Sequence, residues 1–152
     1  MTATQVAWLN DPENVRYSEQ RHSKHTEESQ HNYLNSFPAN SHIWLIKHQG
    51  RFDIGTISAH IDEHNRIANM GILIGKEHWG QGVGREAWSA VMTFLEKQCH
   101  MHKIEAGCYT SNRAMVRLAL AAGMQPDGVR YDHFLSENGR PIALVHFAKF
   151  FP

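Results

Sequence analysis

Residues His78–Trp88 read HWGQGVGREAW, in which three glycines at alternate positions precede a segment with helical periodicity. Glycine allows the backbone to approach a ligand closely, and the first turn of a helix offers unpaired N–H groups at the positive end of its dipole. Phosphate groups bind in that environment. The stretch from Gly80 to Arg85 therefore predicts a phosphate or pyrophosphate cradle. The alternative is a glycine-rich turn that only joins a strand to a helix.

Two common nucleotide-binding loops fit this stretch less well. Gly82–Ala87 matches the G-x-G-x-x-A dinucleotide fingerprint, which directly follows the first strand of a parallel unit. Here the preceding strand-like segment ends near Ile74, and short antiparallel strands are expected before it. A Rossmann fold is therefore the weaker alternative. Gly71–Lys76 is one residue too short for a Walker loop and lacks its Ser or Thr, which excludes that loop.

The segments on both sides of the glycine loop predict a sheet with helices packed on it. Upstream, three strand-like segments with short turns indicate an antiparallel meander: Ile43–Lys47, Phe52–Ile61 and Arg66–Ile74. Downstream, apolar residues recur on one helical face: Trp88, Val91, Met92, Leu95 and Cys99. A strand, a second helix and a hairpin follow: Lys103–Tyr109, Asn112–Ala122, Val129–Leu135 and Ile142–Phe150.

Two further helices are expected near the start of the chain. Asp11-Pro12-Glu13 is typical of a helix start, with an N-cap, a proline at the first position and an acid in the first turn. Another helix is expected from near Thr26, carrying Tyr33, Leu34 and Phe37. Because no repeat or linker interrupts the chain, we expect a single domain over residues 1–152. Its expected class is α/β, with a mixed, mostly antiparallel sheet flanked by helices.

The composition is that of a globular protein without a strong charge. Hydrophobic residues make up 41% of the chain, and 15 basic residues balance 15 acidic ones. Neither nucleic acid nor a membrane is therefore an expected partner. Two cysteines form no disulfide framework, and no segment suits a signal peptide or a membrane span, so a cytoplasmic location is expected. His22, His25 and His31 are spaced too loosely for a metal site, so no metal is expected.

Two motifs together resemble the GNAT family of acyl-CoA N-acetyltransferases. Trp79–Gly84 stands where that family has Q/R-x-x-G-x-G/A, with Trp79 in place of the usual Gln or Arg. The form W-G-x-G-x-G-x-E-A is similar to the branch that contains the ribosomal-protein N-terminal acetyltransferases. Asn112–Met124, NRAMVRLALAAGM, is similar to the family's N-x-x-A/S…G-F helix. The order of elements also agrees, except that the family's first strand is expected to be short or missing here.

The resemblance implies an acetyl-CoA site in three parts, with acetyl-CoA as co-substrate. Strand backbone would meet the pantetheine arm, beside a β-bulge that separates this strand from the next: Ile72, Leu73 and Ile74. Backbone N–H groups would bind the pyrophosphate: Gly80, Gln81, Gly82, Val83, Gly84 and Arg85. Asn112 would bind the pantetheine, act only as a helix N-cap, or do both. Arg117 would reach the adenosine end.

The acid and the base of the reaction are less clearly marked. Acetyl transfer needs a neutral amine, a polarised thioester carbonyl and a proton for the leaving thiolate. The family often has a Tyr and a Ser at the positions of Ala119 and Met115, so its usual acid is missing here or is supplied elsewhere. We consider Glu105 as a base through water, Tyr109 as an acid on the same strand face, and His133 in the last hairpin. Each of the three has an ordinary structural role as its alternative.

These features predict an enzyme that moves the acetyl group of acetyl-CoA to a primary amine by direct attack in a ternary complex. The expected acceptor is a small amine or a nucleotide-linked amino sugar, and a protein N-terminal α-amine is the close alternative. A non-catalytic acyl-CoA-binding sensor is the alternative of another class, favoured by Ala119 and Met115. A homodimer that covers an exposed sheet edge is a further hypothesis.

Overall fold

The computed structural model describes residues 2–152; Met1, which the predicted single domain includes, lies outside the described residues. Twelve elements follow one another along the chain: α1 (Ala3–Asn10), η1 (Glu19–His22), α2 (Glu27–Asn35), β1 (His42–His48), β2 (Phe52–Asp62), β3 (Ile67–Ile74), η2 (Lys76–His78), α3 (Val83–Lys97), β4 (Lys103–Tyr109), α4 (Arg113–Ala121), β5 (Gln125–Leu135) and β6 (Pro141–Phe150).

The six strands form one mixed sheet in the order β1-β2-β3-β4-β6-β5. All neighbouring strands pair antiparallel except β3 and β4, which are parallel and are connected through α3. The predicted α/β class with a mostly antiparallel sheet is confirmed. Within residues 2–152 no strand precedes α1.

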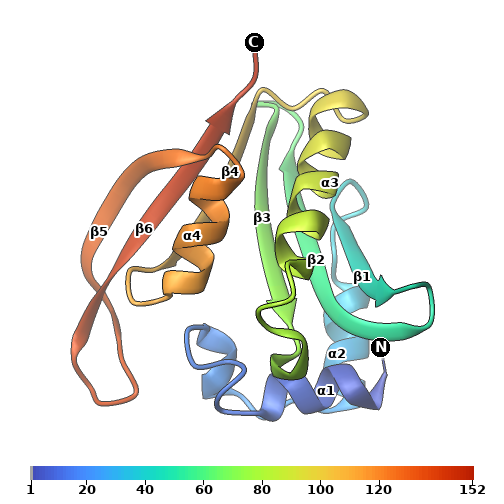
Figure 1. Ribbon diagram of the computed structural model, residues 1–152, viewed down its shortest axis with the longest axis vertical. Coiled ribbons are helices and arrows are strands. Elements are labelled where there is room, and N and C mark those ends of the chain that lie inside the picture. The colour runs from blue at the N-terminus through green and yellow to red at the C-terminus, as the bar shows by residue number, and fades with distance from the viewer. Residues whose placement is uncertain (1) are drawn as a thin grey trace.

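The two faces of the sheet are covered by different helices. Because side chains alternate along a strand, Ile57 and Met70 point to one face and pack with Trp88 of α3 in the core. Helices α3 and α4 lie in front of this face in Figure 1. The alternate residues, such as Ser58 and Gly71, point to the other face, toward α1 and α2.

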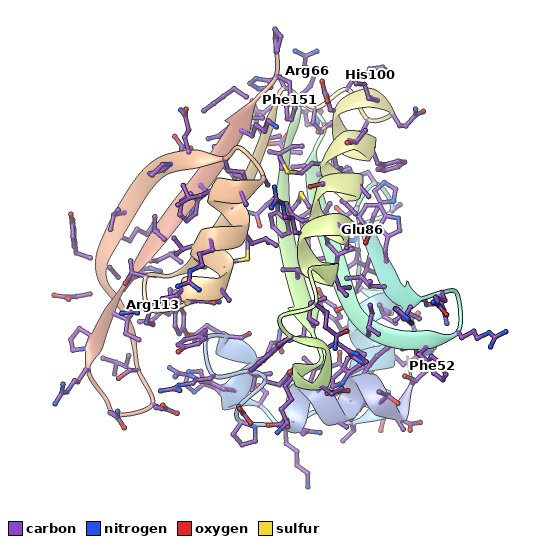
Figure 2. All side chains as sticks on the ribbon, in the orientation of Figure 1. Phe52, Arg66, Glu86, His100, Arg113 and Phe151 are labelled. Carbon is purple, nitrogen blue, oxygen red and sulfur yellow. The ribbon has the colours of Figure 1, made fainter. Side chains whose placement is uncertain are left out.

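Strands β3 and β4 stay together at only one end. Their pairing covers Ile67–Asn69, and Met70–Ile74 have no partner on β4. At the joined end, the N–H of His102 donates to Arg66 O at 2.9 Å, and the N–H of Phe151 donates to His102 O at 2.8 Å. Figure 2 labels Arg66 and Phe151 at this end. The expected separation of the strands therefore occurs. The expected β-bulge does not, because β3 keeps a continuous register with β2 from Ile67 to Ile74.

The prediction that a helix starts at Asp11 is wrong. Asp11 instead ends α1, with the extended backbone angles (φ −84°, ψ 113°) that a residue before proline prefers. Its carboxylate accepts from the N–H of Glu13 at 3.0 Å, so the Asp-Pro pair starts a turn rather than a helix. The second helix does start after Thr26, but it ends at Asn35, before Phe37.

Candidate functional site

A cavity of about 560 Å³ lies beside the unpaired edge of β3, with α4 lining it as well. We call it the edge cavity. All eleven residues that the sequence predicts as cofactor contacts line it: Ile72, Leu73, Ile74, Gly80, Gln81, Gly82, Val83, Gly84, Arg85, Asn112 and Arg117. The separation of β3 from β4 thus brings together residues from one strand, one loop and two helices.

Backbone groups of β3 point into the edge cavity. The N–H of Gly75 donates to Ile54 O of β2 at 2.9 Å, which fixes the alternation of the ladder. Every second residue therefore turns its N–H and C=O away from β2, and Ile72 and Ile74 are among these. The carbonyl of Ile74 accepts from the indole Nε1 of Trp79 at 2.9 Å. Ile72 is left with a donor and an acceptor facing the cavity.

The glycine loop leads into the N-terminus of α3. Gly80 and Gly82 have φ angles of +75° and +78°, which favour glycine, and no other heavy atom lies within 4 Å of where a Cβ would stand. The first N–H groups of α3 have no partner within the helix. Its first turn packs against α4 and β3, since a Cβ on Gly84 would lie 3.6 Å from Leu118. The open loop, the free N–H groups and the positive end of the helix dipole together make this a suitable binding site for a pyrophosphate.

Asn112 occupies the N-cap of α4. Its side-chain oxygen accepts from the N–H of Met115 at 3.2 Å, so the capping role is confirmed. The Nδ2 group of Asn112 is then the part of the side chain able to donate to a ligand in the edge cavity. Arg117 lies on the same helix and also lines this cavity.

Asn14 is a residue of the edge cavity that the sequence reasoning missed. Both atoms of its side-chain amide are enclosed, and neither has a hydrogen-bond partner among the described residues. An unpaired buried amide costs about 1–3 kcal/mol, so it commonly marks a site completed by a ligand or water. Lys76 holds the turn before it through ion pairs with Asp11 at 2.7 Å and Glu13 at 3.1 Å. The hydrogen bond from Lys76 lowers the pKa of Asp11.

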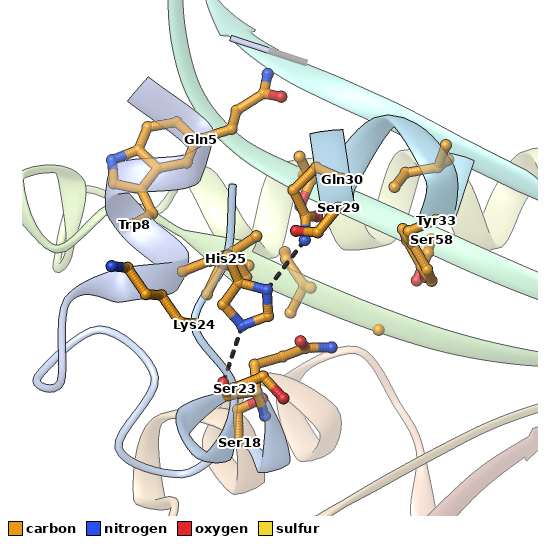
Figure 3. A pocket seen from close by; sticks show the side chains of 17 residues that line it. Gln5, Trp8, Ser18, Ser23, Lys24, His25, Ser29, Gln30, Tyr33 and Ser58 are labelled. Atoms are coloured by element: carbon orange, nitrogen blue, oxygen red, sulfur yellow. Dashed lines mark hydrogen bonds between the residues drawn. The ribbon is translucent and has the colours of Figure 1, made fainter. Parts of the chain in front are cut away.

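A second cavity, of about 500 Å³, lies on the other face of the sheet under α1 and α2. We call it the helix cavity. It shares Ser18, Ile72 and Leu73 with the edge cavity, so the two spaces meet at β3. Figure 3 shows the imidazole of His25 held between the side chain of Gln30 (3.0 Å) and the backbone carbonyl of Gln20 (2.9 Å). This buried network ties α2 to η1 and shapes the wall of the cavity.

The three catalytic candidates lie outside the linings of both cavities. Glu105 is paired with Lys103 at 3.3 Å, which also binds Asp127 at 2.7 Å. His133 is exposed on β5, edge-on to Phe134 with 4.6 Å between ring centroids. Glu105, His133 and Tyr109 are absent from the described residues that line either cavity.

Tyr109 is the candidate with the most unusual surroundings. Its ring is buried beside Phe134, and its hydroxyl donates to the carboxylate of Glu19. Burial, and then the contact with Glu19, raise the pKa of Tyr109 to about 12. Glu19 directly follows Ser18, which lines both cavities. Burial also raises the pKa of Cys108 to about 11, which keeps this thiol protonated and unreactive at neutral pH.

Comparison with known proteins identifies the family. Residues 2–125 match the family model described as the acetyltransferase (GNAT) domain. The chain is 35% identical over 89 residues to the uncharacterized N-acetyltransferase YoaA of Bacillus subtilis, a match covering 58% of this chain and 50% of that protein. It is 28% identical over 88 residues to the uncharacterized N-acetyltransferase p20 of Bacillus licheniformis, covering 58% and 49%. The match thus spans about half the length of these relatives.

Solved structures agree on the fold. The spermidine N-acetyltransferase of Vibrio cholerae in complex with CoA and spermine superposes with a TM-score of 0.84 at 18% identity, covering 99% of this chain and 92% of that one. A GNAT acetyltransferase of Bacillus anthracis superposes with a TM-score of 0.80 at 19% identity, covering 95% and 86%. The chain therefore belongs to the GNAT acetyltransferase family, whose members use acetyl-CoA as co-substrate. None of these matches separates one branch of the family from another.

Two further features of the described residues concern membranes and metals. No helix within residues 2–152 is long and apolar enough to cross a membrane. The same residues contain no group of three or more His, Cys, Asp or Glu side chains placed to hold a metal ion.

Proposed function

We propose that this chain, as one N-acetyltransferase domain over residues 1–152, transfers the acetyl group of acetyl-CoA to a primary amine by direct attack. The proposal rests on one observation above all. Two cavities on opposite faces of the sheet meet at Ser18, Ile72 and Leu73, where the edge of β3 is unpaired. A donor bound in one cavity and an amine bound in the other would meet there in a ternary complex.

The edge cavity supplies the donor site. The N–H and C=O of Ile72 would bind the pantetheine amides as a neighbouring strand does. The N–H groups from Gly80 to Arg85 would hold the pyrophosphate. Asn112 Nδ2 would donate to the arm, and the amide of Asn14 would both donate to it and accept from it. Acetyl-CoA brings the activated thioester when bound, and these residues fix its position.

At the junction, the amine nitrogen forms a bond to the thioester carbonyl carbon as the C–S bond breaks. The amine gives up a proton to water, and the departing thiolate takes a proton from the protein. Backbone N–H at the free edge of β3 polarises the carbonyl. We assign the proton for the thiolate to Tyr109, whose pKa of about 12 keeps the phenol protonated at neutral pH. Because Tyr109 lines neither cavity, the proton would reach the thiolate through water beside Ser18, which adjoins its partner Glu19. We assign no step to Glu105 or His133.

The acceptor that we propose is a small amine or a nucleotide-linked amino sugar. Spermidine in the name of the Vibrio cholerae enzyme supports amine acetylation in this fold, and 18% identity carries no specific substrate across. A protein N-terminal α-amine stays the alternative acceptor.

The test is release of the CoA thiol from acetyl-CoA with a panel of amines, beside calorimetric titration with CoA. We expect CoA to bind and thiol release to depend on the amine. CoA binding without turnover of any amine would favour the sensor alternative, and stabilisation by NAD instead of CoA would overturn the proposal.

A further inference from the structure

We infer that the helix cavity is the acceptor site and that it selects an amine with one positive charge and several hydroxyl groups, of the amino-sugar type, over a polyamine. This inference rests on the proposed function, because it assumes that acetyl-CoA occupies the edge cavity. It goes further by naming the acceptor's place and its chemistry.

The location follows from the contact between the two cavities. Leu73 and Gly71 of β3 line the helix cavity from the face opposite α3, and Ile72 lines both cavities. Gly71 packs closely beside Ser58 on this floor, because a Cβ there would lie 3.2 Å from the hydroxyl oxygen of Ser58. An amine bound over Gly71 lies next to the unpaired edge of β3, where the thioester is expected.

The charge of the helix cavity argues against a polyamine. No Asp or Glu stands among the described residues that line it, and Lys24 and His25 are its basic residues. Glu19 and Glu28 adjoin lining residues in the sequence but do not themselves line the cavity, and Glu19 is already bound to Tyr109 and to His22 at 3.1 Å. A polyamine would place ammonium groups in this cavity without a counter-charge, which is unfavourable.

The same absence of carboxylates helps a single amine to react. An ammonium that loses water and gains no negative partner has a lowered pKa, so more of it is the neutral nucleophile. A cavity without Asp or Glu among its described residues therefore discriminates against additional charges and activates the amine that it admits.

Hydroxyl groups dominate the polar surface that the helix cavity offers. Six side chains bring one each: Ser18, Ser23, Ser29, Tyr33, Thr56 and Ser58. Two of these already have partners in the protein, since Ser29 Oγ accepts from the N–H of Thr26 and donates to its carbonyl, and Ser18 Oγ accepts from the N–H of Gln20. A hydroxyl both donates and accepts, so it pairs well with the hydroxyls of a sugar. The cavity volume of about 500 Å³ is within the usual range for small-molecule sites, and it exceeds the volume of a simple alkylamine. Lys24 is exposed and offers a cation for a phosphate at the solvent side.

The experiment compares kcat/KM for thiol release with three groups of acceptors: hexosamines free and nucleotide-linked, the polyamines spermidine and spermine, and short peptides with a free N-terminus. We expect a hexosamine to exceed spermidine by at least about tenfold, and the free and nucleotide-linked arms show whether the phosphate contributes. A preference for spermidine or for a peptide overturns the inference while the proposed function stands. Turnover of no amine is a failure of the proposed function, and it overturns the inference as well.

A charge variant tests the cavity itself. Ser58→Asp adds a carboxylate to its wall and should move the hexosamine-to-spermidine ratio at least about tenfold toward spermidine, because a partly buried ion pair is worth that much. Ser58→Asn is the neutral variant of the same size, and Ser89→Asp adds the same charge on exposed α3 outside both cavities. Ser89→Asp should keep the wild-type ratio, and Ser58→Asn, which removes one hydroxyl without adding a charge, should change the ratio much less than Ser58→Asp. An unchanged ratio in a folded Ser58→Asp protein, or an equal change in Ser58→Asn, overturns the inference.

Discussion

The indole Nε1 of Trp79 donates a hydrogen bond to the backbone carbonyl of Ile74, 2.9 Å away. This bond joins the glycine loop to the end of β3, so the two parts of the proposed donor site are fixed relative to each other. It also gives a role to the residue that departs from the family's usual Gln or Arg. The Trp79 side chain makes its hydrogen bond to the protein's own backbone.

Trp79→Phe should therefore weaken CoA binding without unfolding the chain. The ring is kept and one neutral hydrogen bond, worth about 1 kcal/mol, is lost, so the dissociation constant should rise by about fivefold. Calorimetric titration with CoA measures it. An unchanged dissociation constant would mean that the loop holds its position without this bond.

Gly82→Asp should abolish CoA binding. The loop is open at this position and a carboxylate would stand against the pyrophosphate, which predicts a loss of more than about a hundredfold. Gly82→Asn is the matched control, because Asn tolerates the positive φ of +78° and has the same size without the charge. We expect Gly82→Asn to retain binding. Equal affinities for Gly82→Asp and the wild type would remove the cradle from the account.

Asn14→Leu should have opposite effects on stability and on affinity. The amide of Asn14 has no partner among the described residues, so an apolar side chain of similar size should raise the free energy of unfolding by about 1 kcal/mol. If acetyl-CoA completes its hydrogen bonds, affinity for acetyl-CoA should fall in the same protein. Urea unfolding and calorimetry give the two values. Raised stability with unchanged affinity would show that Asn14 contacts no donor.

Tyr109→Phe should change the alkaline stability of the protein. The pKa of Tyr109 is about 12 in the folded chain against an ordinary value of 10, so the folded state holds the phenolic proton more tightly than the unfolded state. Its contribution is fully present below pH 10 and is lost as the pH rises through about 12. The difference in unfolding free energy between wild type and Tyr109→Phe should shrink over that interval. A constant difference would mean that the pKa of this phenol is not raised.

Tyr109→Phe also tests the proton donor. If Tyr109 protonates the thiolate, kcat should fall by about 10²–10⁴-fold, the usual contribution of a general acid, with KM for acetyl-CoA little changed. Equal kcat values in the two proteins would show that Tyr109 is not the proton donor and that the enzyme accelerates acetyl transfer by positioning the two substrates.

Local patterns in the sequence were sufficient for most elements. Strand β4 has the predicted bounds, Lys103–Tyr109, and Asn112 caps α4 as expected. Both signals are short-range: a run with strand composition between turns, and a side chain that accepts from an N–H three residues ahead. The glycine-loop and α4 walls of the edge cavity were predictable because their residues belong to two contiguous motifs.

Where contacts between distant segments determine the structure, local sequence patterns gave a wrong prediction or no prediction. Asp11-Pro12 has the residues of a helix start, but Asp11 binds Lys76 and ends α1 instead. Nothing local marks Asn14, whose importance lies in the partners that it lacks. The helix cavity joins α1, η1, α2 and three strands, so no single segment of sequence carries its pattern.

We propose, as the central claim, that acetyl-CoA bound in the edge cavity acetylates an amine at the junction with the helix cavity. The most direct test is amine-dependent release of the CoA thiol by the wild-type chain and by Gly82→Asp, over the same panel of amines. We predict thiol release with at least one amine for the wild type and none above background for Gly82→Asp. Equal release by the two proteins, or no release by the wild type with any amine, would contradict the claim.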